Sequence, residues 1–386
     1  MVDVLPDRAR KGRGAVSNPS GRYEMYQRVA VADGWEARWP DGTADGERQP
    51  GDSAIDGMED GSADGTLPPL ATTVGIDASR TVITRNTSPD IPFDRSINPY
   101  RGCEHGCVYC FARPTHAWLG LSPGLDFETK LFAKPEAPRL LEKELAKPSY
   151  RPATIALGTN TDPYQPIERQ LQITRSILEV LLRARHPVAI VTKSQLVLRD
   201  LDVLSALAAA RLVRVMVSVT TLDPVLARRM EPRATAPARR VETIRALARA
   251  GVPAGVMTAP MIPGLNDDEL ESILETAAQA GAEMAGYILL RLPLEIKHLF
   301  LEWLEEHYPA RKSRVISLLR EARGGKLYDS AWGTRMKGQG VHAELLARRF
   351  ALACKRLHLD RGSERWDFDS AAFRRPRWAG EQLSLL

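Results

Sequence analysis

The chain has little cysteine, few aromatic residues and no long apolar run. Four of its 386 residues are cysteine and 6% are aromatic. Because a disulfide framework needs cysteines spread along the chain, four cysteines of which three lie close together exclude that class of fold. No stretch of 18 apolar residues occurs, so we expect no membrane span. The first residues lack the apolar core of a signal peptide, and we therefore expect a cytoplasmic protein.

Charge is distributed unevenly along the sequence. The net charge is +5, but residues 33–64 contain ten acidic and two basic residues, so the remaining chain is strongly basic. A basic body can bind phosphate groups, which favours a nucleic-acid partner. Arginines that only keep the surface soluble explain the charge equally well.

Composition divides the chain into four expected regions. Residues 1–78 are predicted to be mostly disordered, because this acidic, Gly-rich region has little to bury. Its basic segment 10–24, RKGRGAVSNPSGRYE, is either a solvated tail or a contact for a partner. We expect the core at 79–300, a helical extension at 301–358 and a basic flexible tail at 359–386.

Within the core, short apolar runs alternate with amphipathic segments. The expected strands are 96–101, 154–157, 188–192, 213–219, 254–260 and 286–292, and the expected helices are 166–185, 199–211, 237–251 and 267–281, followed by 294–307, 313–323 and 342–357. This alternation predicts an α/β fold with parallel strands and right-handed crossovers. Six such units are fewer than a closed barrel needs. We therefore expect an open partial (β/α)6 TIM-like barrel, with functional residues after its strands.

Three cysteines form a tight cluster in the segment NPYRGCEHGCVYCFARP. Cys103, Cys107 and Cys110 have the spacing Cys-x3-Cys-x2-Cys. Thiolates are the ligands of iron–sulfur clusters. A four-iron cube held by three cysteines leaves one iron without a protein ligand, and that iron can bind a small molecule through an amine and a carboxylate. Gly102 and Gly106 ease the tight path that this spacing demands.

Two other interpretations of the cysteines remain open. Zinc prefers four closed ligands, and His105 or His116 could be the fourth. The chain would then be a non-catalytic, zinc-bearing interaction module. Cys354 lies far along the chain in a helical pattern, where a buried core residue is expected.

The cysteine loop resembles the signature of the radical S-adenosylmethionine (SAM) superfamily, with Tyr109 as the aromatic residue before the last cysteine. The segments GTNTDPYQPIE at 158–168, TKS at 192–194, RD at 199–200, MEPRA at 230–234 and APMIPGLND at 259–267 are similar to the branch related to spore photoproduct lyase. The N-terminal segments look like those of an uncharacterised bacterial subfamily. The resemblance covers about residues 95–300. It implies a [4Fe–4S] cluster, SAM, and an electron donor such as flavodoxin or ferredoxin.

The resemblance also implies where SAM lies, across the strand ends. The expected SAM contacts are Tyr109, Gly158, Thr159, Asn160, Thr161, Asp162, Lys193, Ser194, Ser218, Thr220, Arg240 and Met261. Among these, Asp162 suits the ammonium group and Lys193 the carboxylate. A turn at Asp162, structural roles for the Ser and Thr residues, and core packing for Met261 are the alternatives.

The substrate is less well defined. The related lyase repairs a thymine lesion in DNA with the help of a cysteine near the second strand, and the matching segment LGTNTDPY has none. We therefore expect a radical SAM enzyme of unknown reaction, lyase-like or a transferase, that acts on DNA in repair or modification. RNA, a protein or a small molecule is the alternative substrate.

The last residues offer a separate indication. The segment QLSLL resembles the short peptide by which bacterial repair proteins bind the DNA sliding clamp, with Gln382, Leu383, Leu385 and Leu386 as the expected contacts. Ordinary packing of the tail is the alternative.

Overall fold

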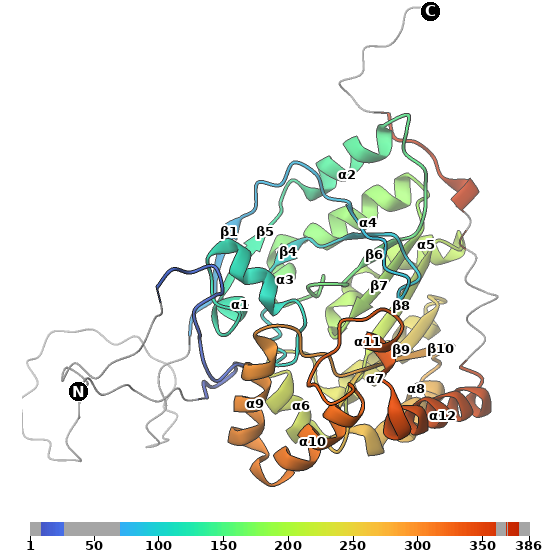
Figure 1. Ribbon diagram of the computed structural model, residues 1–386. Helices are drawn as coiled ribbons and strands as arrows, with labels where there is room; N and C mark the ends of the chain where they lie inside the picture. Colours follow the sequence, from blue (N-terminus) through green and yellow to red (C-terminus); the bar gives the residue numbers. More distant parts are fainter. Residues whose placement is uncertain (1–8, 27–69, 360–367, 369, 378–386) are drawn as a thin grey trace, which may run out of the picture.

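The computed structural model describes residues 9–26, 70–359, 368 and 370–377. Its main sheet has the strand order β10-β9-β8-β7-β6-β3-β2 (Figure 1). Six neighbouring strands are parallel, namely β3 (Arg95–Ile97), β6 (Ile155–Leu157), β7 (Val188–Thr192), β8 (Val213–Ser218), β9 (Ala254–Met261) and β10 (Met284–Leu289). β2 (Thr84–Arg85) is antiparallel and ends the sheet. The predicted open, partial (β/α)6 barrel is therefore confirmed.

One face of the central strands is apolar and buried, which suits a parallel sheet covered by helices. In β7, Val188 and Ile190 are fully buried, as are Val215 and Val217 in β8. Their β-branched side chains also favour the extended backbone. The same strands join the main hydrophobic core, which the crossover helices complete.

Helices connect and cover the strands. In chain order they are η1 (Arg113–Leu119), α1 (Asp126–Thr129), α2 (Ala137–Ala146), α3 (Glu168–Leu171), α4 (Ile173–Arg183), η2 (Gln195–Asp200), α5 (Leu201–Ala209), α6 (Pro224–Met230), α7 (Pro237–Arg249), η3 (Asp267–Glu269), α8 (Leu270–Gln279), α9 (Ile296–His307), α10 (Pro309–Glu321), α11 (Thr334–Lys337), α12 (Gly340–Leu357) and η4 (Ser370–Ala372). Figure 1 shows α2 beside α4 and α12 beside α8. No helix among the described residues is both long and apolar enough to span a membrane.

A second, smaller sheet lies beside the barrel. Its order is β1-β5-β4, with β1 at Thr73–Ile76, β4 at Tyr100–Arg101 and β5 at Lys130–Ala133. The segment 96–101, expected as one strand, is split between the two sheets. The expected helix 166–185 is also divided, because Gln172 has a φ of 50° between α3 and α4.

The expected region boundaries differ from the described structure in three places. The boundary at 300 falls inside α9, which begins at Ile296. Residues 9–26, expected in a disordered region, include the buried run 13–17 and pack against the barrel. Phe373, expected in a flexible tail, packs against Tyr150 and His186. Residues 27–69 and 378–386, including the clamp-like tail, lie outside the described residues.

Candidate functional site

The three clustered cysteines lie on the loop that follows the first parallel strand. Cys103 and Cys107 are buried and Cys110 is half-buried. The N–H of Cys103 donates to the carbonyl of Phe127 at 2.9 Å, and the N–H of Val108 donates to the carbonyl of Met230 at 3.1 Å. Because β3 runs parallel to β6, this loop leaves the sheet at its carboxyl end, where barrel enzymes have their active sites.

Two glycines give the cysteine loop its tight path. Gly102 has a φ of 75° and Gly106 a φ of 68°, in the left-handed region that favours glycine. A Cβ at Gly102 would lie 2.9 Å from the carbonyl oxygen of Phe127, and one at Gly106 would lie 2.7 Å from the carboxylate of Glu128. Both positions therefore exclude a side chain, as the close cysteine spacing predicts.

The thiols lie in an environment that opposes their ionisation. Burial raises the pKa of all three, that of Cys107 to about 12. Negative charge on neighbouring groups raises the pKa of Cys103 and Cys107 further, whereas backbone hydrogen bonds at Cys103 and Cys110 oppose the rise. A bound cation reverses this balance, because coordination favours the thiolate. The cysteines are thus suited to be ligands more than to react as thiolates by themselves.

A buried ion pair fixes the backbone of the cysteine loop. Arg113 donates from Nε to the carbonyl of Cys107 at 2.9 Å, and from Nη2 to the carbonyl of Gly106 at 3.1 Å. The same Nη2 contacts the carboxylate of Glu128, and both side chains are fully buried. The rigid, planar guanidinium matches several fixed acceptors at once. It therefore holds the two carbonyls in place, and Glu128 supplies the compensating charge.

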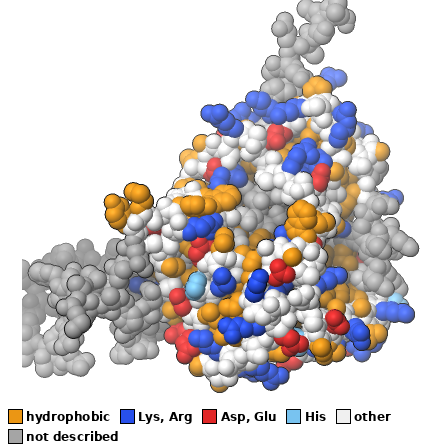
Figure 2. Space-filling view, in the orientation of Figure 1, with side chains coloured by type: hydrophobic (Ala, Val, Ile, Leu, Met, Phe, Trp, Pro, Cys, Tyr) orange, Lys and Arg blue, Asp and Glu red, His pale blue; other side chains and the backbone are white. Residues whose placement is uncertain are grey.

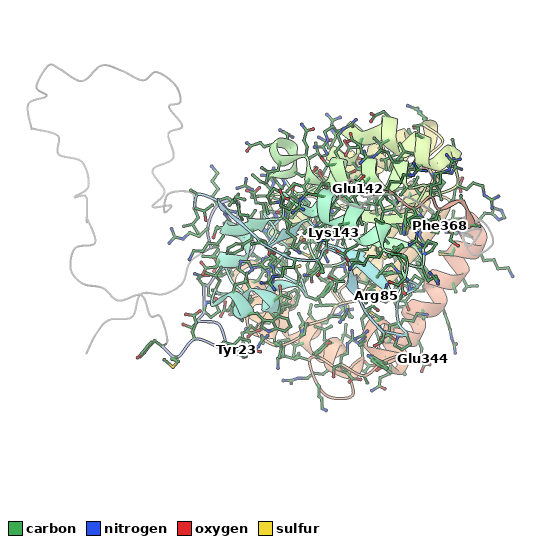
Figure 3. All side chains as sticks on the ribbon, turned by 90° about the horizontal axis from the view of Figure 1, so that it is seen from above. Tyr23, Arg85, Glu142, Lys143, Glu344 and Phe368 are labelled. Carbon is green, nitrogen blue, oxygen red and sulfur yellow. The ribbon has the colours of Figure 1, made fainter. Side chains whose placement is uncertain are left out.

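The N-terminal segment 9–26 packs against this ion pair. The N–H groups of Gly14 and Ala15 each donate to a carboxylate oxygen of Glu128 at 2.9 Å. A Cβ at Gly14 would lie only 1.7 Å from the carbonyl oxygen of Gly106. A buried carboxylate needs several donors, and this segment provides two of them. The segment continues to Tyr23, which Figure 3 shows at the periphery of the molecule.

His105 and Asp162 connect the cysteine loop to the second and third strands. Nδ1 of His105 lies 3.4 Å from Oδ2 of Asp162, which also accepts the N–H of Lys193 at 2.7 Å. Oδ1 accepts the hydroxyl of Thr192 at 2.7 Å and the N–H of Tyr164 at 2.9 Å. Burial alone would raise the pKa of Asp162, but His105 and these hydrogen bonds lower it to about 2. The carboxylate is therefore anionic, and it also forms the predicted turn.

Tyr109 joins a buried polar network behind the cysteines. Its hydroxyl donates to Glu231, which also accepts the hydroxyl of Thr220 at 2.7 Å and pairs with Arg240. Burial would raise the pKa of Glu231, but Arg240 and Lys193 lower it to about 2. Nζ of Lys193 lies 5.7 Å from the centroid of the Tyr109 ring. Among the described residues, no carboxylate lies within ion-pair distance of this ammonium group.

Other predicted SAM contacts use their polar atoms within the chain. Ser194 caps η2 by accepting the N–H of Leu196, and Ser218 donates to the carbonyl of Ala259. Arg240 donates to the carbonyls of Thr235 and Ser218 as well as pairing with Glu231, and Met261 is fully buried in the main core. These four side chains support the strand ends.

The predicted loop at 158–161 lies after β6. A Cβ at Gly158 would lie 1.9 Å from the carbonyl oxygen of Val191, so only glycine fits there. The N–H of Asn160 donates to Asn98 Oδ1 at 3.1 Å, and the hydroxyl of Thr161 donates to the carbonyl of Tyr100 at 2.9 Å. Thr159 is half-buried on the same loop.

The donor set fits a multinuclear cluster better than a single zinc ion. Among the described residues, no group of three or more His, Cys, Asp or Glu is placed to share one metal ion. Nε2 of His116 lies 2.9 Å from the carbonyl of Lys130, its Nδ1 is buried without a hydrogen-bond partner among the described residues, and His105 faces Asp162. In a four-iron cube each thiolate binds a different corner, which suits spaced cysteines.

Sequence reasoning missed several groups that form the site. Arg113 and Glu128 carry no recognisable motif, because the ion pair and the carbonyls it supports appear only in three dimensions. For His105 the sequence indicates only a possible zinc ligand. Glu231 had a signal, since it lies in the segment MEPRA that supported the resemblance.

Comparison with known proteins agrees with this geometry. The family model for the Radical SAM superfamily matches residues 97–277. An uncharacterised protein of Mycobacterium tuberculosis is 39% identical over 232 residues, which cover 60% of this chain and 68% of that protein. An uncharacterised protein of Methanocaldococcus jannaschii is 28% identical over 213 residues, which cover 55% of this chain and 76% of that protein.

Solved structures show the same fold at low sequence identity. A mutant of spore photoproduct lyase with bound AdoMet and dinucleoside spore photoproduct aligns over 74% of this chain and 78% of its own, with a TM-score of 0.52 and 16% identity. Another mutant of that lyase gives a TM-score of 0.51 and 17% identity over 74% of this chain and 79% of its own. The chain belongs to the radical SAM superfamily, a superfamily of enzymes.

Proposed function

We propose that Cys103, Cys107 and Cys110 hold a [4Fe–4S] cluster, and that the enzyme uses it to cleave SAM reductively. The observation that carries this proposal is the cysteine loop itself, with two buried cysteines and one half-buried cysteine at the carboxyl end of the sheet. When bound, the cluster would supply one electron to the SAM sulfonium, so that the bond between sulfur and C5′ breaks and methionine and a 5′-deoxyadenosyl radical are formed. Arg113 and Glu128 hold the loop that presents the thiols.

The surrounding residues then have distinct roles. Lys193, with its ammonium above the Tyr109 ring, binds the SAM carboxylate. Tyr109 packs near the adenine, and Glu231 orients its hydroxyl. The loop 158–162 lies around the SAM amino group. The negative charge of Asp162 attracts this group, while its oxygens accept hydrogen bonds from the chain. Ser218 at the end of β8 and Thr220 just after it are proposed to contact the ribose.

For the substrate we propose DNA, in repair or modification. The basic body of the chain and the fold shared with spore photoproduct lyase support this choice. RNA, a protein or a small molecule remains the second candidate, because the segment LGTNTDPY lacks a cysteine. DNA that neither binds nor increases SAM cleavage by the purified enzyme would favour this second candidate.

Two partners follow from the proposal. The cluster needs an electron donor such as flavodoxin or ferredoxin. The tail with Gln382, Leu383, Leu385 and Leu386 is proposed to bind the DNA sliding clamp, which would place the enzyme on DNA. A pull-down with purified clamp tests this contact, and Leu385→Ala should abolish it. If the clamp retains neither the wild type nor the variant, the tail no longer supports a DNA substrate.

The metal content tests the cluster directly. After anaerobic reconstitution we expect iron and sulfide, a brown colour, and the electron paramagnetic resonance of a reduced [4Fe–4S] cluster. Alanine at Cys107 should abolish these signals, whereas Cys354→Ala, which removes a buried cysteine on α12, should keep them. Zinc instead of iron in wild type would establish the interaction-module alternative.

A further inference from the structure

Among the described residues, two arginines at the carboxyl end of β10 have no carboxylate within ion-pair distance. Arg291 follows this strand, and Arg323 follows α10. Arg323 donates from Nη2 to the carbonyl of Leu290 at 2.8 Å. Arg291 donates from Nη1 to the sulfur of Met336 at 3.5 Å, and a thioether is a weak acceptor. The Nε atoms of both arginines are buried and meet no acceptor among the described residues.

Among the described residues, neither positive charge has a carboxylate within ion-pair distance, and Asp329 acts on Arg323 only from farther away. Burial lowers the pKa of Arg323 to about 10, and the charge of Arg291 adds to this effect. The positive charge of Arg291 contributes to the lowered pKa of Asp90. The Asp90 carboxylate, however, already pairs with Arg335 and accepts the N–H of Gly333. By contrast with these two arginines, Arg349 has the carboxylate of Glu271 within ion-pair distance. Desolvated cations without counter-ions raise the free energy of the protein, and a bound anion would offset this cost.

The location connects this pair to the cysteine loop. The guanidinium of Arg291 lies 5.1 Å from the centroid of the Phe111 ring, and Phe111 follows the last clustered cysteine. Leu290 and Leu292, on either side of Arg291, pack in the same apolar cluster as Cys107 and Tyr109. Phe111 is 43% exposed, so solvent reaches this place. In Figure 2, basic, acidic and hydrophobic side chains lie next to one another on the face where Figure 1 places α11.

We infer that Arg291 and Arg323 bind a phosphate group of the substrate beside the cysteine loop. Nη2 of Arg291, which has no partner among the described residues, can donate to a phosphate oxygen, and the planar guanidinium suits such an anion. Arg323 adds a second fixed charge. The inference deepens the proposed function by assigning its substrate a phosphate ester, which either a nucleic-acid strand or a free nucleotide could provide.

The test measures binding of a fluorescein-labelled, single-stranded oligonucleotide by anisotropy. Arg291→Gln should weaken binding by about 10- to 100-fold, as the loss of a charged hydrogen bond does. Arg291→Lys should restore part of the affinity. Arg291→Gln should also reduce the slope of log affinity against log salt concentration by about one unit. Thermal unfolding and iron content show whether each variant has kept its fold.

Arg349→Gln is the matched control, because it removes the same charge from an ion pair with Glu271 between α12 and α8. It should bind the oligonucleotide like wild type. Equal binding by Arg291→Gln and Arg349→Gln would overturn the inference, and so would a wild type that binds no phosphate probe.

Competitors identify the source of the phosphate. Thymidine monophosphate that competes as well as an unlabelled strand indicates a free nucleotide, and competition by the strand alone indicates nucleic acid. Succinate that competes as well as inorganic phosphate would contradict a phosphate site. Because this assay needs neither cluster reduction nor SAM cleavage, its failure is distinguishable from failure of the proposed function.

Discussion

At the scale of single residues, the site combines groups that the sequence identifies with groups that only the fold brings together. The cysteines, Gly102 and Gly106 follow from spacing, since their roles depend on neighbours in the chain. The contact between Glu128 and Gly14 joins positions 114 residues apart, and no local pattern encodes it. Arg240 looked like a ligand contact in sequence, but the fold provides it with a buried carboxylate.

Lys193 should contribute to SAM affinity and little to the fold. Its ammonium group lies above Tyr109 and has no carboxylate partner among the described residues. Lys193→Gln should weaken SAM binding by about 10- to 100-fold in calorimetry, because a charge-assisted hydrogen bond is lost. Lys143→Gln, on the outer surface of α2 (Figure 3), is the control. Equal SAM affinities of the two variants would contradict the assigned role.

Glu231 should be among the residues whose loss destabilises the fold most. Glu231→Ala leaves Arg240 buried without its counter-ion, and breaking such a pair costs about 3–5 kcal/mol. Urea unfolding measures this loss. Glu242→Ala removes an exposed partner of Arg245 and should cost about 0.5 kcal/mol or less. If Glu231→Ala lowered the free energy of unfolding as little as Glu242→Ala does, the polar network would not stabilise the fold.

At the scale of elements, the sequence predicts the buried strands well and the exposed ones poorly. β7 and β8 lie in apolar, β-branched runs that become covered parallel strands. β1 and β2 are short and largely exposed, so they depend on pairing with distant segments and show no hydrophobic pattern. For the segment 10–24 the sequence leaves open a solvated tail or a contact for a partner, because its packing depends on hydrogen bonds to distant residues such as Glu128 and Glu302.

The N-terminal segment should stabilise the cysteine loop. Gly14→Val places side-chain atoms where Gly106 lies, so the segment cannot pack against the loop. We expect faster hydrogen–deuterium exchange across residues 102–113 and a lower iron content after reconstitution. Lys11→Ala changes an exposed position of the same segment and should have neither effect. Unchanged exchange in Gly14→Val would mean that the loop is stable without this support.

His186, where the C-terminal segment packs, should make stability depend on pH. Burial lowers its pKa to about 4, and Phe373 and Tyr150 surround the ring. Below pH 6.5 the unfolded chain binds a proton that the folded imidazole rejects, so stability falls as the pH decreases from 6.5 towards 4, by up to about 3 kcal/mol. Urea unfolding across this range should show a weaker pH dependence for His186→Gln than for wild type. The exposed His298→Gln should keep the wild-type dependence, and an equal slope in all three proteins would refute the effect.

At the scale of the whole molecule, the partial barrel places its chemistry along one edge. The cysteine loop follows β3, Asp162 follows β6, Lys193 follows β7, and Arg291 follows β10. Parallel strands bring these sequence-distant positions to the same carboxyl end. The order of the strands could be predicted from the alternation alone. The ion pairs that support the loop could not, because they depend on how the peripheral segments pack around the barrel.

The most direct measurement of the central claim is 5′-deoxyadenosine formation from SAM by the anaerobically reconstituted, reduced protein. Wild type should form this product even without its substrate, and Cys103→Ala should form none, because the cluster would be lost. Cys354→Ala should retain the wild-type yield. A wild type that contains the intact cluster, binds SAM and forms no 5′-deoxyadenosine under reducing conditions would contradict the proposed chemistry.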